Sequence, residues 1–331
     1  MRRIAVTTAL VVAAFAATHP VAAQGARAGV LLTLPTSARA LGLGDASAAT
    51  MSDEWALFTS PAQLARATRF SAGLASEAYL ASTQLSAVAV AIPVWRGTLG
   101  IGATLLDYGS VKEITASASG LDGIETGRTV SAEDMTVQLG FAMPMSVVSG
   151  LRGGAVVEMV RTRIADLSAS GLAASLGLAW SSRSGWDLAA AVQHLGDGIA
   201  LGATHGALPE TWRAGVAAPA MHLRRAALRP MAEVRSVRGG VASGTGAAEL
   251  SWPGVLGSEL IARAAYTVRG SGDDHWPLSL GAGVVMGRFS VDYAMERFTR
   301  LDQVTHRIGL RFARPPAVSS TVSAAPTATI R

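Results

Sequence analysis

The chain has 331 residues, of which 50% are hydrophobic and 15% are charged, with 36 glycines and no cysteine. The lack of cysteine excludes disulfides and thiol chemistry. The formal net charge of +5 comes without a basic cluster interleaved with aromatic residues, so nucleic-acid binding is not indicated.

The N-terminus has the pattern of a secretory signal peptide over residues 1–23. Two arginines precede an alanine-rich apolar run over residues 4–17, and small residues stand at the cleavage position before Gln24. This pattern predicts export and cleavage after Ala23. An N-terminal membrane anchor is disfavoured, because the apolar run is short and is broken by Pro20.

The next segment, residues 24–68, carries two glycines, Gly42 and Gly44, one residue apart. A dinucleotide-binding loop would need glycine or alanine where Ser47 stands, and a strand before it, which Pro35 interrupts. The pattern therefore favours a tight turn over a nucleotide-binding loop.

From residue 69 onward, apolar and small residues alternate in segments of about ten residues, the length of a tilted strand that crosses a bilayer. In the segment 134–145, for example, Leu139 and Phe141 fall on one face and Gln138 falls on the other. Such alternation is typical of a barrel wall with one face to lipid and the other to the lumen.

The alternation predicts fourteen strands between residues 69 and 313, an even number as in bacterial single-chain barrels. After the leader, the chain has no apolar run long enough for a membrane-spanning helix, and a membrane sheet must close on itself to leave no unpaired edge. The predicted strands are 69–79, 82–93, 97–108, 134–145, 151–163, 170–181, 185–195, 208–218, 226–236, 245–252, 256–268, 277–287, 289–296 and 304–313.

A soluble β-sandwich is the alternative, because its strands alternate too. Its second face would be polar and charged, whereas the second face here is mostly Gly, Ala, Ser and Thr. Short links at 95–97, 182–184 and 287–288 indicate periplasmic turns, and longer links at 109–133 and 196–207 indicate extracellular loops. The expected fold class is therefore all-β, a 14-stranded transmembrane antiparallel barrel.

Four charged residues fall on the luminal face of the last two predicted strands: Asp292 and Glu296 on one, Arg307 and Arg311 on the other. If the two strands pair as a hairpin, acids and arginines meet inside the barrel. A ladder of salt bridges that neutralises buried charge is the favoured interpretation, and a polar ligand site is the alternative.

The sequence contains no recognisable catalytic set, so we expect no enzyme. The histidines after the leader are widely spaced without metal-ligand spacing, and no Gly-x-Ser-x-Gly elbow frames a nucleophile. We expect no cofactor and no metal. Residues 314–331 are rich in Pro, Ser, Thr and Ala, a composition typical of a disordered tail.

Residues 34–65 resemble the N-terminal signature of the PorV/PorQ family of outer-membrane proteins, which belongs with the larger group of FadL-like barrels. Where that family usually has Asn before Pro-Ala, this chain has Ser60. Residues 208–217 and 289–312 are also similar, the latter to the family's final hairpin. The motif residues that carry the N-terminal resemblance are Pro35, Arg39, Gly42, Gly44, Asp45, Pro61 and Ala62.

The resemblance implies a barrel in the bacterial outer membrane, residues 69–313, whose N-terminal segment 24–68 folds into the lumen as a plug or hatch. Within that segment, glycines would let the chain turn tightly in a narrow space. Residues 51–64 would form a short helix that is capped by Ser52 and ended by Pro61.

Two functions are compatible with this resemblance. PorV-like proteins act with the type IX secretion system, which would make the chain a docking component whose partners are secretion-system proteins or exported cargo. FadL-like barrels pass hydrophobic molecules, so the alternative is a channel that holds a hydrophobic ligand in its lumen. An outer-membrane enzyme would lack its nucleophile set. In either favoured case the wall contacts outer-membrane lipid.

Overall fold

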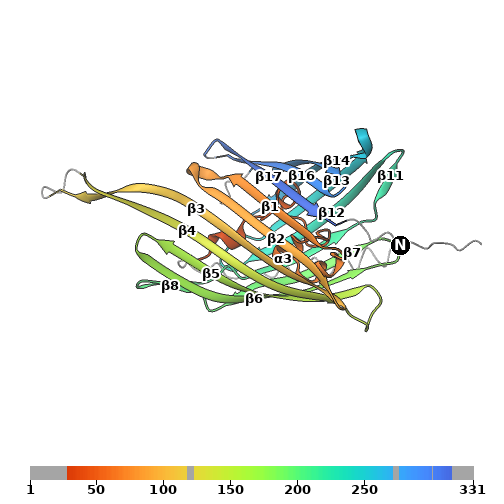
Figure 1. Ribbon diagram of the computed structural model, residues 1–331, viewed down its shortest axis with the longest axis horizontal. Helices are drawn as coiled ribbons and strands as arrows, with labels where there is room; N and C mark the ends of the chain where they lie inside the picture. The colour runs from red at the N-terminus through yellow and green to blue at the C-terminus, as the bar shows by residue number, and fades with distance from the viewer. Residues whose placement is uncertain (1–27, 118–122, 271–275, 300, 315–331) are drawn as a thin grey trace, which may run out of the picture.

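The computed structural model describes residues 28–117, 123–270, 276–299 and 301–314. Within these residues, fourteen strands form one closed antiparallel β-barrel (Figure 1). Strands that follow one another in the wall pair as neighbours, and the pairs β1–β17 and β10–β12 complete the ring. The wall strands are β1 (Ser71–Ala78), β2 (Gln84–Val94), β3 (Gly97–Ala116), β4 (Gly123–Pro144), β5 (Leu151–Ile164), β6 (Leu167–Ser181), β7 (Asp187–Gly196), β10 (Thr211–Ala217), β12 (Ala226–Val237), β13 (Ser243–Pro253), β14 (Glu259–Arg269), β15 (Leu278–Met286), β16 (Phe289–Phe298) and β17 (Gln303–Ala313).

Each of the fourteen predicted strands overlaps one strand of this wall, so the predicted fold class is confirmed. The faces also follow the alternation: in β6, Leu176 points outward and is 51% exposed, whereas Ala173 points inward and is 5% exposed. A closed ring has no free sheet edge, which is the condition for a sheet to stand in lipid. The soluble sandwich is therefore excluded.

The expected extracellular loop at 109–133 is wrong for most of its length. β3 continues to Ala116 and β4 begins at Gly123, and the two strands stay paired beyond the ends of β2 and β5. Bulges after Asp107 and Lys112 interrupt the register. Figure 1 shows this β3–β4 extension projecting from one end of the barrel. β-branched residues in both strands favour the extended backbone.

Three short strands lie outside the wall. β8 (Ile199–Leu201) and β9 (Thr204–Gly206) form a small hairpin within the segment 196–207, which was expected to be a loop. β11 (Met221–Leu223) pairs with the start of β12 and so prolongs the hairpin of β10 and β12. The opposite end of the barrel from the β3–β4 extension carries short links such as 95–96 and 287–288, and we call it the turn end.

Residues 28–67, before β1, lie inside the barrel, and we call them the luminal segment. It contains four short helical turns: η1 (Val30–Thr33), α2 (Ala38–Gly42), α3 (Ala56–Thr59) and η2 (Pro61–Arg66). The single helix expected over 51–64 is therefore wrong. Ser60 has an extended backbone, as residues before proline prefer, and it separates α3 from η2. Ser52 caps neither helix, and the Asp53 carboxylate accepts from the Trp55 amide instead.

Small residues of the wall make room for the luminal segment. Side chains of Trp55 and Leu57 lie directly over Gly73 and Gly140, where a Cβ atom would come within 2.6 Å of them. Such close approach requires glycine. The apolar half of the core forms where these residues meet the alanines of β1 and β2.

In the described part of the chain, no helix has the length and apolar character needed to cross a membrane. The expected signal peptide, residues 1–23, lies outside the described residues, and so does residue 315 onward in the expected tail.

Candidate functional site

The lumen is the candidate functional site, because the luminal segment and the inner wall enclose almost all of the buried charge. Residues 38–64 are nearly all buried, including Leu43 at the end of α2 and Met51 after it. The segment is held on every side by wall strands that lie far from it in the sequence. The chemistry of the lumen is therefore set by which wall side chains meet this segment.

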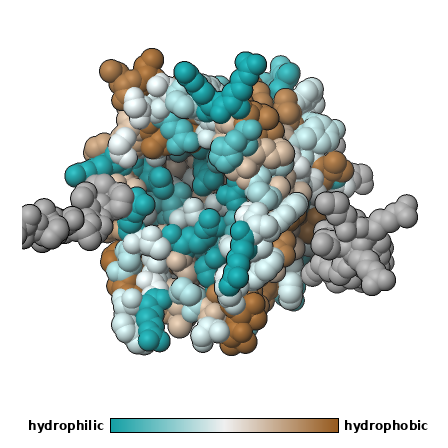
Figure 2. Space-filling model, turned by 90° about the vertical axis from the view of Figure 1, so that its right-hand side faces the viewer, coloured by the Kyte–Doolittle hydropathy of each residue, from teal (hydrophilic) through white to brown (hydrophobic). Residues whose placement is uncertain are grey.

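A cavity of about 280 Å³ lies at the turn end, between the luminal segment and strands β13 to β17. Its lining includes Glu259 and Ser290, which stand next to the links between strands. Figure 2 views the molecule from this end and shows hydrophilic side chains around a hollow. We call it the turn-side cavity.

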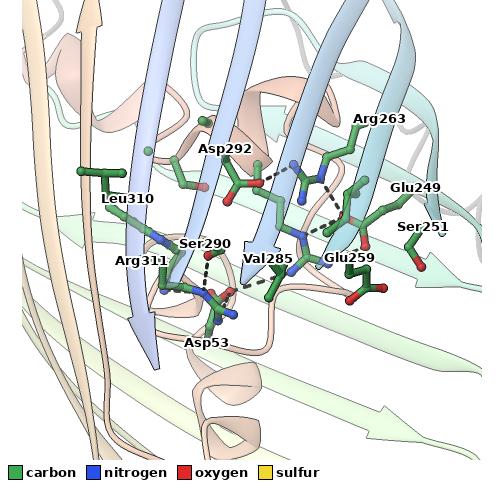
Figure 3. Close-up of a pocket in the computed structure, with 16 residues that line it drawn as sticks. Asp53, Glu249, Ser251, Glu259, Arg263, Val285, Ser290, Asp292, Leu310 and Arg311 are labelled. Atoms are coloured by element: carbon green, nitrogen blue, oxygen red, sulfur yellow. Dashed lines mark hydrogen bonds and ion pairs between the residues drawn. The ribbon is translucent and has the colours of Figure 1, made fainter. Parts of the chain in front are cut away.

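Six alternating charges run along the turn-side cavity, and we call them the charge chain. Two members come from the luminal segment and four come from the wall, so the chain fastens one to the other (Figure 3). In order, its members are Arg311, Asp53, Arg39, Glu249, Arg263 and Asp292.

The distances show that the charge chain is continuous. Arg39 lies 3.1 Å from Glu249 and 3.9 Å from Asp53. Arg263 bridges Glu249 at 2.7 Å and Asp292 at 2.6 Å. Each guanidinium thus has two acidic partners or an acid and a hydroxyl, which is how buried charge is tolerated away from water. The sequence motif residue Arg39 stands at the centre.

Asp45, the second charged motif residue, fastens the far side of the luminal segment. Its carboxylate lies 3.1 Å from Arg213 and 3.0 Å from Arg235, on β10 and β12. Glu233 accepts from Arg213 and also from the backbone amide of Ala48. Asp45 has a positive φ of 65°, a conformation that Asp tolerates better than most residues.

The four C-terminal charges lie in the lumen, but they do not form the ladder expected within their hairpin. β16 and β17 do pair, yet the register sets Arg307 opposite Ala294 and Arg311 opposite Ser290. Arg307 instead binds Glu77 on β1 and the backbone carbonyl of Pro35.

The other three charged residues of this hairpin also have their partners outside it. Arg311 binds Asp53 in the luminal segment, and Asp292 binds Arg263 on β14. Glu296 lies 3.6 Å from Arg269, also on β14. Charge pairing in this barrel therefore runs across several strands and into the luminal segment.

The small motif residues sit at close contacts with the wall. A Cβ atom at Gly42 would lie 2.9 Å from the Cα atom of Gly281, so helix and wall touch backbone to backbone. Gly44 has a positive φ of 57° and ends the turn that follows α2. Pro61 and Ala62 lie against Gly154 and Gly177.

One polar cluster in the wall has no counterpart in the sequence-based expectations. His194 Nδ1 lies 2.8 Å from Glu158, and Gln138 donates to the other oxygen of that carboxylate. A bulge between β6 and β7 sets Ser175 opposite both Gln193 and His194, so two successive residues face the lumen. Bulges re-aim side chains in this way. The local sequence pattern does not predict the position of this bulge.

Glu54 is a fully buried acid of the luminal segment. It has no exposed surface, and neither carboxylate oxygen has a hydrogen-bond partner in the described structure. Burial, reinforced by the neighbouring Asp53 carboxylate, raises the pKa of Glu54 to about 8. Glu54 is therefore mostly protonated at neutral pH.

A second cavity, of about 310 Å³, lies on the other side of α2. Its lining includes Tyr79 and Val241, which stand in strand links at the barrel end from which the β3–β4 extension projects. We call it the extension-side cavity. Among the described residues, no group of three or more His, Asp or Glu side chains is placed to hold a metal ion. The lumen is thus divided into two polar spaces by the luminal segment.

The chain matches no protein-family model and no curated protein sequence. Solved barrels do match it in fold. A FadL homologue of Pseudomonas aeruginosa is 12% identical with a TM-score of 0.52, over 84% of this chain and 97% of that one. The toluene transporter TbuX of Ralstonia pickettii is 14% identical with a TM-score of 0.55, over 83% and 98%. The toluene transporter TodX of Pseudomonas putida is 13% identical with a TM-score of 0.56, over 88% and 99%.

Fold and lumen together define the class: a 14-stranded β-barrel of the bacterial outer-membrane type with the FadL-like fold. At identities of 11–14%, the likeness extends to the fold alone. Among these relatives, CymD is named as a monoaromatic hydrocarbon channel, and TbuX and TodX are named as toluene transporters.

Proposed function

We propose that the protein is an outer-membrane channel for small hydrophobic molecules. The observation that carries the proposal is the likeness of fold to the toluene transporters TodX and TbuX, which extends over at least 83% of this chain and 98% of theirs. A shared barrel with a shared strand number supports a shared mode of transport, although function depends on the site rather than the fold.

The luminal segment supports a channel that is closed at rest. We propose that residues 24–68 act as its plug, with Pro35, Arg39, Gly42, Gly44, Asp45, Pro61 and Ala62 as the residues that seat it. Their contacts with wall strands on opposite sides of the lumen support this role. Transport then requires a local rearrangement of the plug rather than a permanently open pore.

The outer wall offers an apolar groove of about 930 Å³. Its floor is a row of small residues that are register partners across neighbouring strands: Ala190, Ala214, Val234 and Gly244. Leu178 and Trp212 stand beside this row and also line the groove. Grooves of this size with apolar walls suit hydrophobic ligands. We include the groove in the proposal as a place where hydrophobic molecules bind at the wall.

Uptake by cells tests the channel. Cells that make the full chain should take up radiolabelled toluene faster than cells without it. Ala214→Phe would fill the groove and should lower the rate, whereas Ala232→Phe, also on the lipid side, should not. Equal uptake with and without the protein would overturn the channel. Equal uptake by the two variants would remove the groove from the route.

The docking component of a type IX-like secretion system is the second candidate. It rests on the PorV/PorQ resemblance of residues 34–65 and 289–312, and the fold comparisons favour the channel. One structural feature suits docking: the β3–β4 extension exposes Val111, Ile114 and Ile124 beyond the barrel end. If removing residues 109–131 stops surface delivery of exported proteins and spares toluene uptake, docking replaces the channel.

A further inference from the structure

Helix α2 separates the two luminal cavities. On one side of it lies the turn-side cavity, with Arg39, and on the other lies the extension-side cavity, with Leu41 and Gly44. Because α2 has only five residues, the barrier is a single helix turn thick. Between the cavities, the helix rests on Gly281, Ala294 and nearby small residues.

The same four strands line both cavities, with residues a short way apart along each strand. The inner faces of β13, β14, β16 and β17 therefore continue from one cavity to the other past α2. The pairs, turn side first, are Glu249 and Thr245, Arg263 and Thr267, Asp292 and Glu296, and Arg311 and Arg307.

Both cavities are lined by charged and hydroxyl groups together with apolar side chains such as Trp55 and Val241. The lining of each cavity contains three arginines and four acids. On the turn side these are the six members of the charge chain and Glu259. On the extension side the arginines are Arg235, Arg269 and Arg307, and the acids are Asp45, Glu77, Glu233 and Glu296. A hydrocarbon that entered would separate these groups from water without offering hydrogen bonds, which is unfavourable. Small hydrophilic solutes match such a lining. On the extension side Arg213 also pairs with Asp45 and Glu233, so the charges there are even, whereas the turn side has one more acid than arginines, which favours cations.

We infer that β13 to β17 frame a narrow passage for small hydrophilic solutes and cations, and that α2 is its gate. The passage is separate from the route proposed for hydrophobic molecules and goes beyond that function. Closure depends on the fit of α2 against small wall residues. Opening requires that this one turn move and that Arg39 release Glu249, because the cavities already exist on both sides of the turn.

Leu41 is the side chain whose removal should open the gate. It is 2% exposed and packs with Ala38 against Ala294 of β16. Leu41→Ala should raise the conductance of the full-length protein in planar bilayers several-fold, with a preference for potassium over chloride. The matched control is Leu57→Ala, an equally buried leucine of the luminal segment that faces β3 and β4 instead.

A disulfide tests whether α2 itself moves. The native chain has no cysteine, and the Ala38 Cβ atom lies 3.5 Å from the position of a Cβ atom at Gly309. This separation is within the range of disulfides. In the triple variant Leu41→Ala/Ala38→Cys/Gly309→Cys, oxidation should abolish the conductance that Leu41→Ala adds, and reduction should restore it.

Two results would overturn the gate: Leu41→Ala conducting no more than Leu57→Ala, or a locked double-cysteine protein conducting as freely as the reduced one. If Leu41→Ala fails to fold, the double-cysteine protein with native Leu41 is measured instead. Its brief channel openings should disappear on oxidation. Toluene uptake is measured separately, so failure of the gate and failure of the hydrophobic channel are distinguishable.

Discussion

At the scale of single residues, the lumen contains two kinds of buried ionisable group. Arginines such as Arg39 and Arg307 have carboxylate partners within ion-pair distance. Glu54, beside Asp53, has a pKa of about 8 and stays mostly protonated at neutral pH. The first kind fastens the luminal segment to the wall, whereas the second makes its packing depend on pH.

Glu54→Gln should remove a pH dependence of stability. The carboxyl pKa is about 8 in the folded protein and 4.5 in the unfolded chain. As pH rises through that window, the unfolded chain loses its proton and the folded protein keeps it, so folding stability falls. The loss is on the order of a few kcal/mol, since each pKa unit corresponds to about 1.4 kcal/mol.

Thermal unfolding in detergent at pH 5 and pH 8 measures this difference. The wild type should lose more stability between these pH values than Glu54→Gln. Asp302→Asn, a change at an exposed turn, serves as the control and should behave like the wild type. The same pH response in wild type and Glu54→Gln would show that Glu54 is charged in the folded protein.

Arg307→Ala should destabilise the barrel strongly. Arg307 is 2% exposed and Glu77 is 1% exposed, so removing the arginine leaves a buried carboxylate without its cation. Breaking one side of such a pair costs about 3–5 kcal/mol. Arg128→Ala, at an exposed ion pair in the β3–β4 extension, should have a much smaller effect. Urea midpoints compare the two, and equal midpoints would contradict the buried pair.

At the scale of elements, α2 is positioned by close backbone contact with the wall and by the ion pair between Arg39 and Glu249. Gly42 meets Gly281 of β15, and Ala38 meets Gly309 of β17. The helix therefore fits only where both partners are small. This explains the two glycines one residue apart: they allow close contact and a tight turn in the lumen, and they do not belong to a nucleotide-binding loop.

Gly42→Ala should displace α2, because the new Cβ atom would lie 2.9 Å from a backbone atom of Gly281 that cannot turn aside. Overpacking of this kind costs about 1–3 kcal/mol. Gly246→Ala on β13 is the control, since the described chain leaves open space around that position. A lower melting temperature is expected for Gly42→Ala alone. If both variants melt together, the contact is not tight.

At the scale of the whole molecule, the wall and the luminal segment contribute differently to stability. The wall closes its own backbone hydrogen bonds from β1 through β17. The luminal segment adds ion pairs and apolar contacts across the lumen. The barrel should therefore survive without the segment, but as an open pore.

Deletion of residues 28–66 should leave a folded barrel with large, steady conductance in planar bilayers, whereas the intact protein conducts little. The closed ring satisfies its own backbone groups, and water in the emptied lumen can solvate the wall charges. Heat-modifiable migration in gels would confirm that the deleted form is folded. An intact protein that conducts as freely as the deletion would mean that the luminal segment blocks nothing.

Much of the fold could be predicted from the sequence. Alternation in segments such as 134–145 and 170–181 places side chains on one face or the other, and this is a property of neighbouring residues. Fourteen strands and a closed ring follow from alternation together with the need to leave no edge in lipid. The length of β3 and β4 did not follow, because strands can continue past the membrane.

The partners of the site could be decided only by the tertiary structure. The lumen-facing positions of Asp292 and Arg307 follow from alternation, but their pairing with Arg263 and with Glu77 does not. Arg307 and Glu77 are 230 positions apart in the chain and meet because β1 pairs with β17. A face is determined by a residue and its neighbours, whereas a partner depends on register, bulges and ring closure, which belong to the whole barrel.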